Sequence, residues 1–193
     1  MQCGAWLEAG RSVPVAVDLS PALLRSADYA SYLIDKVVGS GIPPWMIRFE
    51  VTESTLASES AVAAPRRIHD FGTRISVDDF GTGWSSLGRL KQLPVDTVKI
   101  DRSFVTGMTA DRRDAAIVRS VVALAQDMQL RTIAEGVETP QVARALVRLG
   151  VQRAQGFLCS RPVTGSALAT WYDSWQLGRR PPAPSSPRTD RTS

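Results

Sequence analysis

Six short runs rich in β-branched and apolar residues recur along this chain, and stretches with helical spacing separate most of them. This alternation is typical of βαβ units, in which consecutive strands run parallel and helices cover the sheet. It predicts an α/β fold built on one parallel sheet. The expected strands are Val13–Val17, Met46–Val51, Arg74–Val77, Thr97–Ile100, Thr132–Ala134 and Val151–Ala154.

The helices are expected where apolar residues recur at intervals of three and four. Asp111 or Thr109 is the expected N-cap of the third helix, and Thr139 followed by Pro140 begins the fourth. Glycines stand where three helices should stop, at Gly41, Gly72 and Gly150. The expected helices are Tyr29–Val38, Ser58–Phe71, Asp114–Met128, Gln141–Leu149 and Gly165–Trp175.

Polar side chains follow each of the six strands and decide between two parallel-sheet architectures. In a doubly wound sheet, ligand-facing residues concentrate at the point where strand order reverses. In a (β/α)₈ barrel they come from the ends of many strands and meet at one mouth. The pattern therefore favours a TIM-type (β/α) barrel. The residues concerned are Asp18, Glu50, Asp78 with Asp79, Asp101 (just past Lys99), Glu135 and Gln155.

Length places a limit on that barrel. A complete barrel has eight strands and typically about 250 residues, whereas this chain has 193 residues and six expected strands. We therefore expect an incomplete barrel over residues 1–177 that lacks about two N-terminal strands. Met1–Ala9 resembles the last turns of a helix whose start would precede Met1.

The segment 178–193 differs in composition from the rest of the chain. It has four prolines, four arginines against the single Asp190, and no large apolar residue. Such a segment cannot bury enough surface to offset its ordering entropy, so we expect a disordered tail. The tail also supplies most of the net charge of +4. The nearly neutral remainder lacks the basic footprint of a protein that binds duplex nucleic acid.

The sequence also indicates the cellular compartment of the protein. No run of 18 or more apolar residues is present, so no membrane span is expected in this chain, and the first ten residues lack the pattern of a signal peptide. Cys3 and Cys159 lie far apart and form no CxxC spacing. They are expected to be free thiols of a cytoplasmic protein.

The string VDDFGTGWSSL, from Val77 to Leu87, carries the clearest chemical signal. Adjacent carboxylates at a strand end repel unless cations lie between them or one is protonated. Two divalent ions about 3.5–4 Å apart are a common solution and suit phosphoester hydrolysis. An isolated Asp-Asp pair is more often a helix cap and a turn. The further carboxylates at other strand ends favour the metal site.

Together with other strings, this one resembles the EAL domain family of bacterial cyclic di-GMP phosphodiesterases. The resemblance covers about Met1 to Trp175. The matching strings are VAVDLS (15–20), FEVTES (49–54), SVDDFGTGWSSL (76–87), LPVDTVKIDRSFV (93–105), IVRSVVALAQDMQLRTIAEGVET (117–139) and AQGFLCSRPV (154–163).

The resemblance implies a modified TIM barrel that cleaves one phosphodiester of cyclic di-GMP, giving linear pGpG, with two Mg²⁺ or Mn²⁺ ions. It implies metal ligation by Asp18, Glu50, Asp78 and Asp79, and catalytic roles for Lys99 and Glu135 beside the attacking water. It implies supporting roles for Glu53 in anchoring the DFGTG loop and for Asp101, Glu138 and Gln155 around substrate and metal. Family members are often fused to GGDEF or PAS domains, and many form homodimers.

Simpler interpretations accompany these roles. Lys99 is equally expected to be a buried ion-pair partner of Glu135. Glu53 is equally expected to be a capping or loop-anchoring group. Glu138 more commonly complements a helix dipole from the first turn. His69, the only histidine, is expected to be a favourable charge at a helix C-terminus or a solvated side chain.

Three departures from the family pattern shape the functional hypotheses. The EAL signature, whose glutamate binds metal in the family, would precede Met1. Asp18 stands where the family has Asn, and Trp84 stands where it has Tyr. The first hypothesis is a cyclic di-GMP phosphodiesterase. The alternative is a catalytically inactive module that binds cyclic di-GMP or a protein partner, and an unrelated metal-dependent barrel hydrolase is a third.

Overall fold

The structure is a computed structural model and describes residues 2–26, 28–57, 62–83 and 87–178. Strands and helices alternate along most of it. In chain order the elements are α1 (Gln2–Glu8), β1 (Val15–Asp18), η1 (Leu23–Arg25), α2 (Tyr29–Ser40), η2 (Pro44–Met46), β2 (Ile47–Thr52), η3 (Glu53–Ala57), α3 (Ala63–Asp70), β3 (Arg74–Phe80), α4 (Leu87–Leu90), β4 (Thr97–Ile100), α5 (Arg102–Gly107), α6 (Arg112–Asp127), β5 (Arg131–Ala134), α7 (Pro140–Leu149), β6 (Arg153–Ala154) and α8 (Gly165–Gln176).

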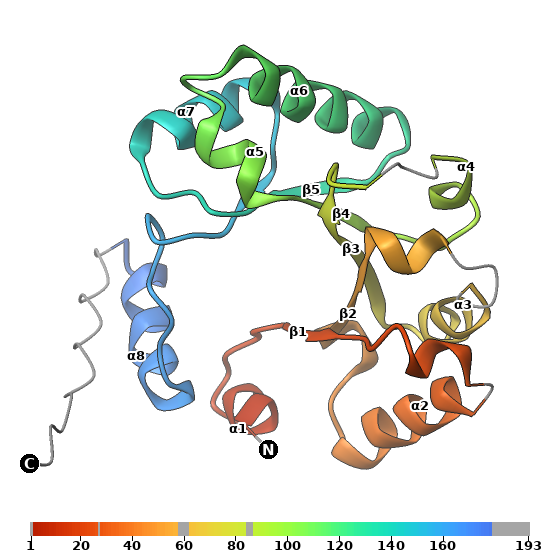
Figure 1. The fold of residues 1–193 in the computed structure, drawn as a ribbon. Coiled ribbons are helices and arrows are strands. Elements are labelled where there is room, and N and C mark those ends of the chain that lie inside the picture. The colour runs from red at the N-terminus through yellow and green to blue at the C-terminus, as the bar shows by residue number, and fades with distance from the viewer. Residues whose placement is uncertain (1, 27, 58–61, 84–86, 179–193) are drawn as a thin grey trace, which may run out of the picture.

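The six strands form one parallel sheet in the order β1-β2-β3-β4-β5-β6, so each strand lies beside its neighbour in sequence. The sheet curves, and α2, α3, α6 and α7 lie on its outer side (Figure 1). This is the incomplete (β/α) barrel that the sequence predicts. The free edges belong to β1 and β6, whose residues are mostly exposed.

All six expected strands are present, and their bounds differ for local reasons. β1 begins at Val15 because Pro14 has no backbone N–H to donate. β6 is only two residues long. Just before it, the side-chain oxygen of Gln152 accepts a hydrogen bond from the backbone N–H of Thr132 at 2.7 Å, where a strand would use its own backbone carbonyl.

The predicted helix signals are also in place. The Asp111 side chain caps α6 by accepting from the N–H of Arg113 at 2.7 Å, so Asp111, and not Thr109, is the cap. Thr139 caps α7, with Pro140 as its first residue. Gly41 and Gly150 end α2 and α7 in the left-handed conformation, which glycine adopts without steric cost. Of the predicted helix 58–71, residues 58–61 lie outside the described part, and α3 covers Ala63–Asp70.

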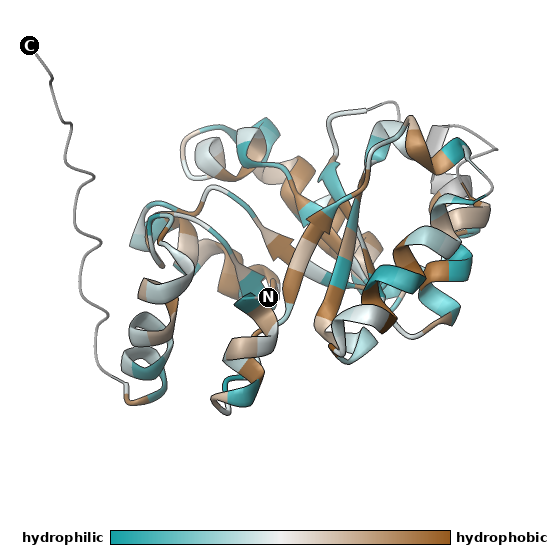
Figure 2. Ribbon diagram, turned by 90° about the horizontal axis from the view of Figure 1, so that it is seen from below, coloured by the Kyte–Doolittle hydropathy of each residue, from teal (hydrophilic) through white to brown (hydrophobic). Residues whose placement is uncertain are grey.

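The main apolar core lies between the sheet and its outer helices. Figure 2 shows strands that are largely hydrophobic and helices that are apolar on the face toward them. Ile75, Val77, Ile100, Val118 and Ile68 are fully buried in this layer. The strand residues that alternate with these side chains therefore face the inside of the curved sheet.

The first and last helices lie side by side, away from the outer layer (Figures 1 and 2). The Nε1 of Trp6 donates to the carbonyl of Gly165 at 3.1 Å, and Arg11 forms a two-pronged ion pair with Asp173 at 2.7 and 2.8 Å. Both cysteines are free, as predicted. Within the described ranges, no helix has the length and apolar character needed to cross a membrane. The predicted disordered tail falls almost wholly on residues 179–193, outside the described part of the chain.

Candidate active site

The carboxyl ends of neighbouring parallel strands meet at one edge of the sheet, and the predicted site residues gather there. Asp18 ends β1, Glu50 lies in β2, Asp78 lies in β3, and Lys99 lies in β4. Glu135 directly follows β5, and its backbone N–H donates to the Ile100 carbonyl at 3.1 Å, which continues the sheet hydrogen bonding. Five strands thus contribute side chains to one cluster.

Lys99 lies at the centre of this cluster. Its Nζ is 2.6 Å from Glu50 Oε2, 2.8 Å from Glu135 Oε1 and 3.0 Å from Asp78 Oδ2. The Lys99 side chain is only 6% exposed. Burial lowers its pKa, but the hydrogen bonds that Lys99 donates to Glu135 and Glu50 outweigh burial, and the net shift is upward. Lys99 is therefore a permanent cation that holds together carboxylates from three strands, including the ion pair with Glu135 that the sequence suggested.

The carboxylates form two groups of three side chains, and each group could hold a cation. Oxygens of Asp18, Glu50 and Asp78 lie within 4.8 Å of one another, as do those of Asp78, Asp79 and Glu135. Asp78 belongs to both groups. A purely carboxylate donor set suits a hard divalent cation such as Mg²⁺ or Mn²⁺, so the residues present fit such ions.

The titration behaviour of two carboxylates reflects this crowding. Burial raises the pKa of Asp79, and the negative charges of Asp78 and Asp101 raise it further. Burial also raises the pKa of Glu135, and the hydrogen bond from Lys99 offsets only part of that shift. Both carboxyl groups therefore lie where a negative charge is disfavoured in the metal-free protein, and where a cation would be stabilised.

Asp79 also has an unusual backbone. Its φ is +54°, a region that few residues other than glycine adopt. The conformation coincides with an irregularity in the β3–β4 register between Val77 and Phe80. Residues held in this way cluster at functional sites, and here the strain directs two consecutive carboxylates to the same end of the sheet.

Glu53 binds the loop that follows the two aspartates. Its Oε2 accepts hydrogen bonds from the backbone N–H groups of Gly81 at 2.9 Å and Gly83 at 3.1 Å. Glu53 is 5% exposed, and a Cβ added at Gly83 would lie 3.1 Å from its carboxyl carbon. A side chain at position 83 would therefore push against the carboxylate that fixes the loop.

Other predicted residues lie at the margin. Asp101 caps α5 by accepting from the N–H of Ser103 at 2.9 Å; burial raises its pKa, but the Ser103 hydrogen bonds outweigh this and lower it. Glu138 is exposed and precedes the Thr139 cap, so the prediction that it lies in the first turn of α7 is wrong. Gln155 is exposed, and its side chain forms no hydrogen bond or ion pair with the described residues of the cluster. Trp84 lies outside the described residues.

One residue and one helix of this region were not predicted. Ser76 is fully buried, and its hydroxyl donates to Glu50 Oε1 at 3.2 Å, so Glu50 is held by Ser76 and Lys99 together. The period-two spacing from Asp78 back to Ser76 is the signal that would have identified it. α5 was also missed, although Asp101 followed two residues later by Ser103 is a helix-start pattern. His69 lies at the end of α3, 3.6 Å from Asp96 and away from the cluster.

Comparison with known proteins identifies the family. The profile of the EAL domain matches residues 2–162, which is most of the chain. The chain belongs to the EAL domain family. The EAL domain of this chain thus contains the whole carboxylate cluster described above.

Individual relatives of this EAL domain are similar over most of its length. The uncharacterized protein Rv1354c of Mycobacterium tuberculosis is 35% identical over 96% of this chain and 30% of its own length. The solved cyclic di-GMP complex of the MucR phosphodiesterase from Pseudomonas aeruginosa is 38% identical, with a TM-score of 0.83 over 86% of this chain and 69% of that one. A complex of Klebsiella pneumoniae BlrP1 with manganese and cyclic di-GMP is 29% identical, with a TM-score of 0.76 over 85% of this chain and 42% of that one. The chain therefore spans between a fifth and two fifths of the curated relatives it matches.

Proposed function

We propose that this EAL domain carries the site of a cyclic di-GMP phosphodiesterase, which hydrolyses one phosphodiester of cyclic di-GMP to give linear pGpG. One observation carries the proposal. Asp78 belongs to two carboxylate groups at once, and Lys99 joins both groups through Glu50, Asp78 and Glu135. The MucR relative, a phosphodiesterase solved with cyclic di-GMP, supports this substrate class.

The proposed cofactor is a pair of Mg²⁺ or Mn²⁺ ions. Asp18, Glu50 and Asp78 would hold one, and Asp78, Asp79 and Glu135 would hold the other. When bound, such ions polarise the phosphodiester and lower the pKa of a coordinated water. The manganese complex of the BlrP1 relative supports this cofactor class. Asp18 offers a charged oxygen where the family pattern has a neutral amide, so we expect tighter metal binding on that side.

The chain's own residues supply orientation and charge. Glu135 Oε1 accepts the hydrogen bond from Lys99 Nζ, which leaves Oε2 available to orient a water for attack on phosphorus. Lys99 stays protonated and would stabilise negative charge that develops on the phosphoryl oxygens. Glu53 would keep the Gly81–Gly83 backbone fixed beside the site.

The test is product formation. The purified chain is incubated with cyclic di-GMP and either Mg²⁺ or Mn²⁺, and pGpG is measured by chromatography. We expect product from the unaltered chain and at least a 100-fold loss in Asp78→Asn, which removes the negative charge of the ligand that both groups share. Asp127→Asn, at the exposed end of α6, is the matched control and should keep full activity. A folded, metal-loaded chain that gives no pGpG would contradict the enzymatic proposal for this chain.

One observation favours the alternative, a module that binds cyclic di-GMP without turnover. Asp18 lies on β1, an edge strand whose outer side has no partner among the described residues. The group formed by Asp18, Glu50 and Asp78 therefore receives described ligands from one side only. Calorimetry with cyclic di-GMP in the presence of Ca²⁺ separates the two functions. Binding without pGpG formation in Mg²⁺ or Mn²⁺ would support the binding module.

A further inference from the structure

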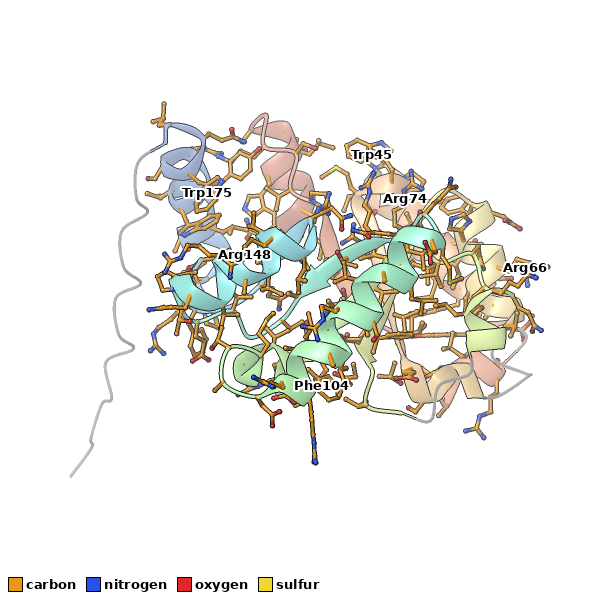
Figure 3. The ribbon with its side chains drawn as sticks, turned by 90° about the horizontal axis from the view of Figure 1, so that it is seen from above. Trp45, Arg66, Arg74, Phe104, Arg148 and Trp175 are labelled. Atoms are coloured by element: carbon orange, nitrogen blue, oxygen red, sulfur yellow. The ribbon has the colours of Figure 1, made fainter. Side chains whose placement is uncertain are left out.

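The end of the sheet opposite the carboxylates is rich in arginine. Arg48 is the second residue of β2, and Arg74, Arg131 and Arg153 are the first residues of β3, β5 and β6. Since the strands are parallel, these four positions lie at a single end of the sheet. Figure 3 shows Arg74 in the upper part of the view and Phe104, which follows β4, in the lower part.

All four arginines occupy inner-face positions of the sheet, but Arg74, which is in register with Arg48, is already paired with Asp96, so the other three are considered further. Arg48 is two residues before Glu50, and Arg131 is four residues before Glu135, so each shares the face of a carboxylate that contacts Lys99. Arg153 is in register with Ile133. Ile133 lies two residues from both Arg131 and Glu135, so all three are on the same face of the strand. Parallel partners in register point to the same face, so Arg153 also faces inward.

The same three guanidinium groups are close enough to influence one another. Burial lowers the pKa of Arg48, and the positive charge of Arg153 is the next cause, with Arg131 contributing in the same direction. The Nε of Arg48 is buried and has no hydrogen-bond partner. An unpartnered buried donor costs free energy, so this group is poised to bind an acceptor.

Nearby carboxylates are already engaged. Asp96 accepts from Arg74 Nη1 at 2.8 Å and from the N–H of Ile75 at 2.9 Å, and Glu50 is bound to Lys99. Across the described ranges, no carboxylate forms an ion pair with Arg48, Arg131 or Arg153. Glu50 and Asp96 attract the Arg48 charge without touching it. The inner face therefore carries three positive charges without an ion-pair partner among the described residues at this end, while the opposite end is strongly acidic.

We propose that Arg48, Arg131 and Arg153 form a binding site for a small oxyanion of the phosphate class, at the end of the sheet opposite the carboxylate cluster. Planar guanidinium groups match phosphate oxygens in pairs, and a multivalent anion offsets several of them at once. The site is independent of the proposed phosphodiesterase function.

The experiment uses the full chain, freed of metal with EDTA so that phosphate cannot bind through cations at the carboxylate end. Equilibrium dialysis with labelled inorganic phosphate, in chloride buffer of constant ionic strength, measures affinity and stoichiometry. We expect one phosphate per chain and at least a fivefold weaker affinity in Arg48→Gln and Arg153→Gln. Arg119→Gln is the matched control, because Arg119 is exposed on α6, and its affinity should be unchanged.

A second arm identifies the source of the phosphate. GMP that displaces the labelled ion would show that the site also accepts a nucleotide phosphate, whereas GMP without effect would restrict it to the free ion; either result supports the site. Absence of saturable binding, or equal affinity in the unaltered chain and Arg153→Gln, would overturn the proposal. Arg153 is exposed on an edge strand, so its variant keeps the test valid if Arg48→Gln fails to fold. Circular dichroism checks the fold of each variant.

Discussion

Replacing Lys99 with Met tests the central electrostatic arrangement of the site. Methionine has similar length but no charge, so the substitution removes one cation and leaves three carboxylates facing each other. These side chains are 9% exposed at Glu50, 19% at Asp78 and 17% at Glu135. Removal of one member of a buried ion pair costs about 3–5 kcal/mol, because the remaining charge is left without compensation. We expect a loss in that range for the metal-free protein.

The loss should depend on pH in a defined direction. The pKa of Glu135 is raised in the folded state, and removal of Lys99 raises it further. A carboxyl group whose folded pKa exceeds its unfolded pKa binds protons more tightly in the folded state, so the variant should gain stability as the pH falls from about 8 toward 5. In the unaltered chain the contribution of Lys99 is fully present below the unfolded lysine pKa of about 10.4. That contribution should not change between about pH 6 and 9.

The measurement is thermal unfolding in EDTA at several pH values. For a chain of 150–250 residues, each kcal/mol corresponds to about 2–4 °C, so the midpoint should fall by about 6–20 °C near neutral pH. Mn²⁺ should restore more of the midpoint in Lys99→Met than it adds to the unaltered chain, because it replaces the missing charge. Lys91→Met, at an exposed position, is the control. A variant as stable as the unaltered chain, or one that loses further stability on acidification, would refute the reasoning.

Three further outcomes are expected. Glu53→Ala removes the acceptor of two backbone hydrogen bonds and should lower the free energy of unfolding in urea by about 2–4 kcal/mol, whereas Glu53→Gln, which keeps one oxygen, should lose less than half of that. Gly81→Ala should lower the free energy of unfolding by about 1–3 kcal/mol, because the backbone φ at this position is +103° and the new Cβ would lie 3.1 Å from a ring carbon of Phe104. Gly88→Ala is the control, because a Cβ there meets no atom within 4 Å and should not destabilise the protein. Equal losses in the two variants would contradict the prediction. A thiol reagent should modify Cys159 before Cys3 in the native protein, because Cys3 is 7% exposed and burial raises its pKa; simultaneous modification would count against the packing of α1.

The strand ends could be predicted because both of their signals are local. A run of apolar residues followed by a carboxylate identifies where a parallel strand ends, and parallel strands end at a common edge. This placed Asp18, Glu50 and Asp78 together. The contacts that Lys99 makes across three strands depend on register and on side-chain length, which a pattern of residue types does not contain. The sequence therefore suggested one ion pair, with Glu135, where the structure has three.

Residues whose role depends on the backbone were harder to predict. The two-residue length of β6 follows from a side-chain oxygen of Gln152 that substitutes for the sheet backbone. The positive φ of Asp79 follows from an irregular register between β3 and β4. Neither feature has a compositional signature, because each depends on how two distant segments meet. Gln155 was predicted from its position after a strand and Glu138 from the family resemblance, but both are exposed and outside the ion-pair cluster.

The arginines at the opposite end were overlooked for a related reason. A charged residue before an apolar run is usually interpreted as the solvated start of a strand, and the exposed positions of Arg131 and Arg153 are consistent with that. The alternation of side chains along a strand changes this interpretation, because it places each of these arginines on the same face of the sheet as a carboxylate of the site. The inner face thus has anionic groups at one end and cationic groups at the other, with Arg131 and Glu135 four residues of strand apart. At about 3.3 Å per residue, that separation exceeds the Debye length of about 8 Å at physiological salt. Arg131 is therefore too far away to be a direct counter-ion for Glu135, whereas Arg48, two residues from Glu50, is still influenced by the charge of that carboxylate.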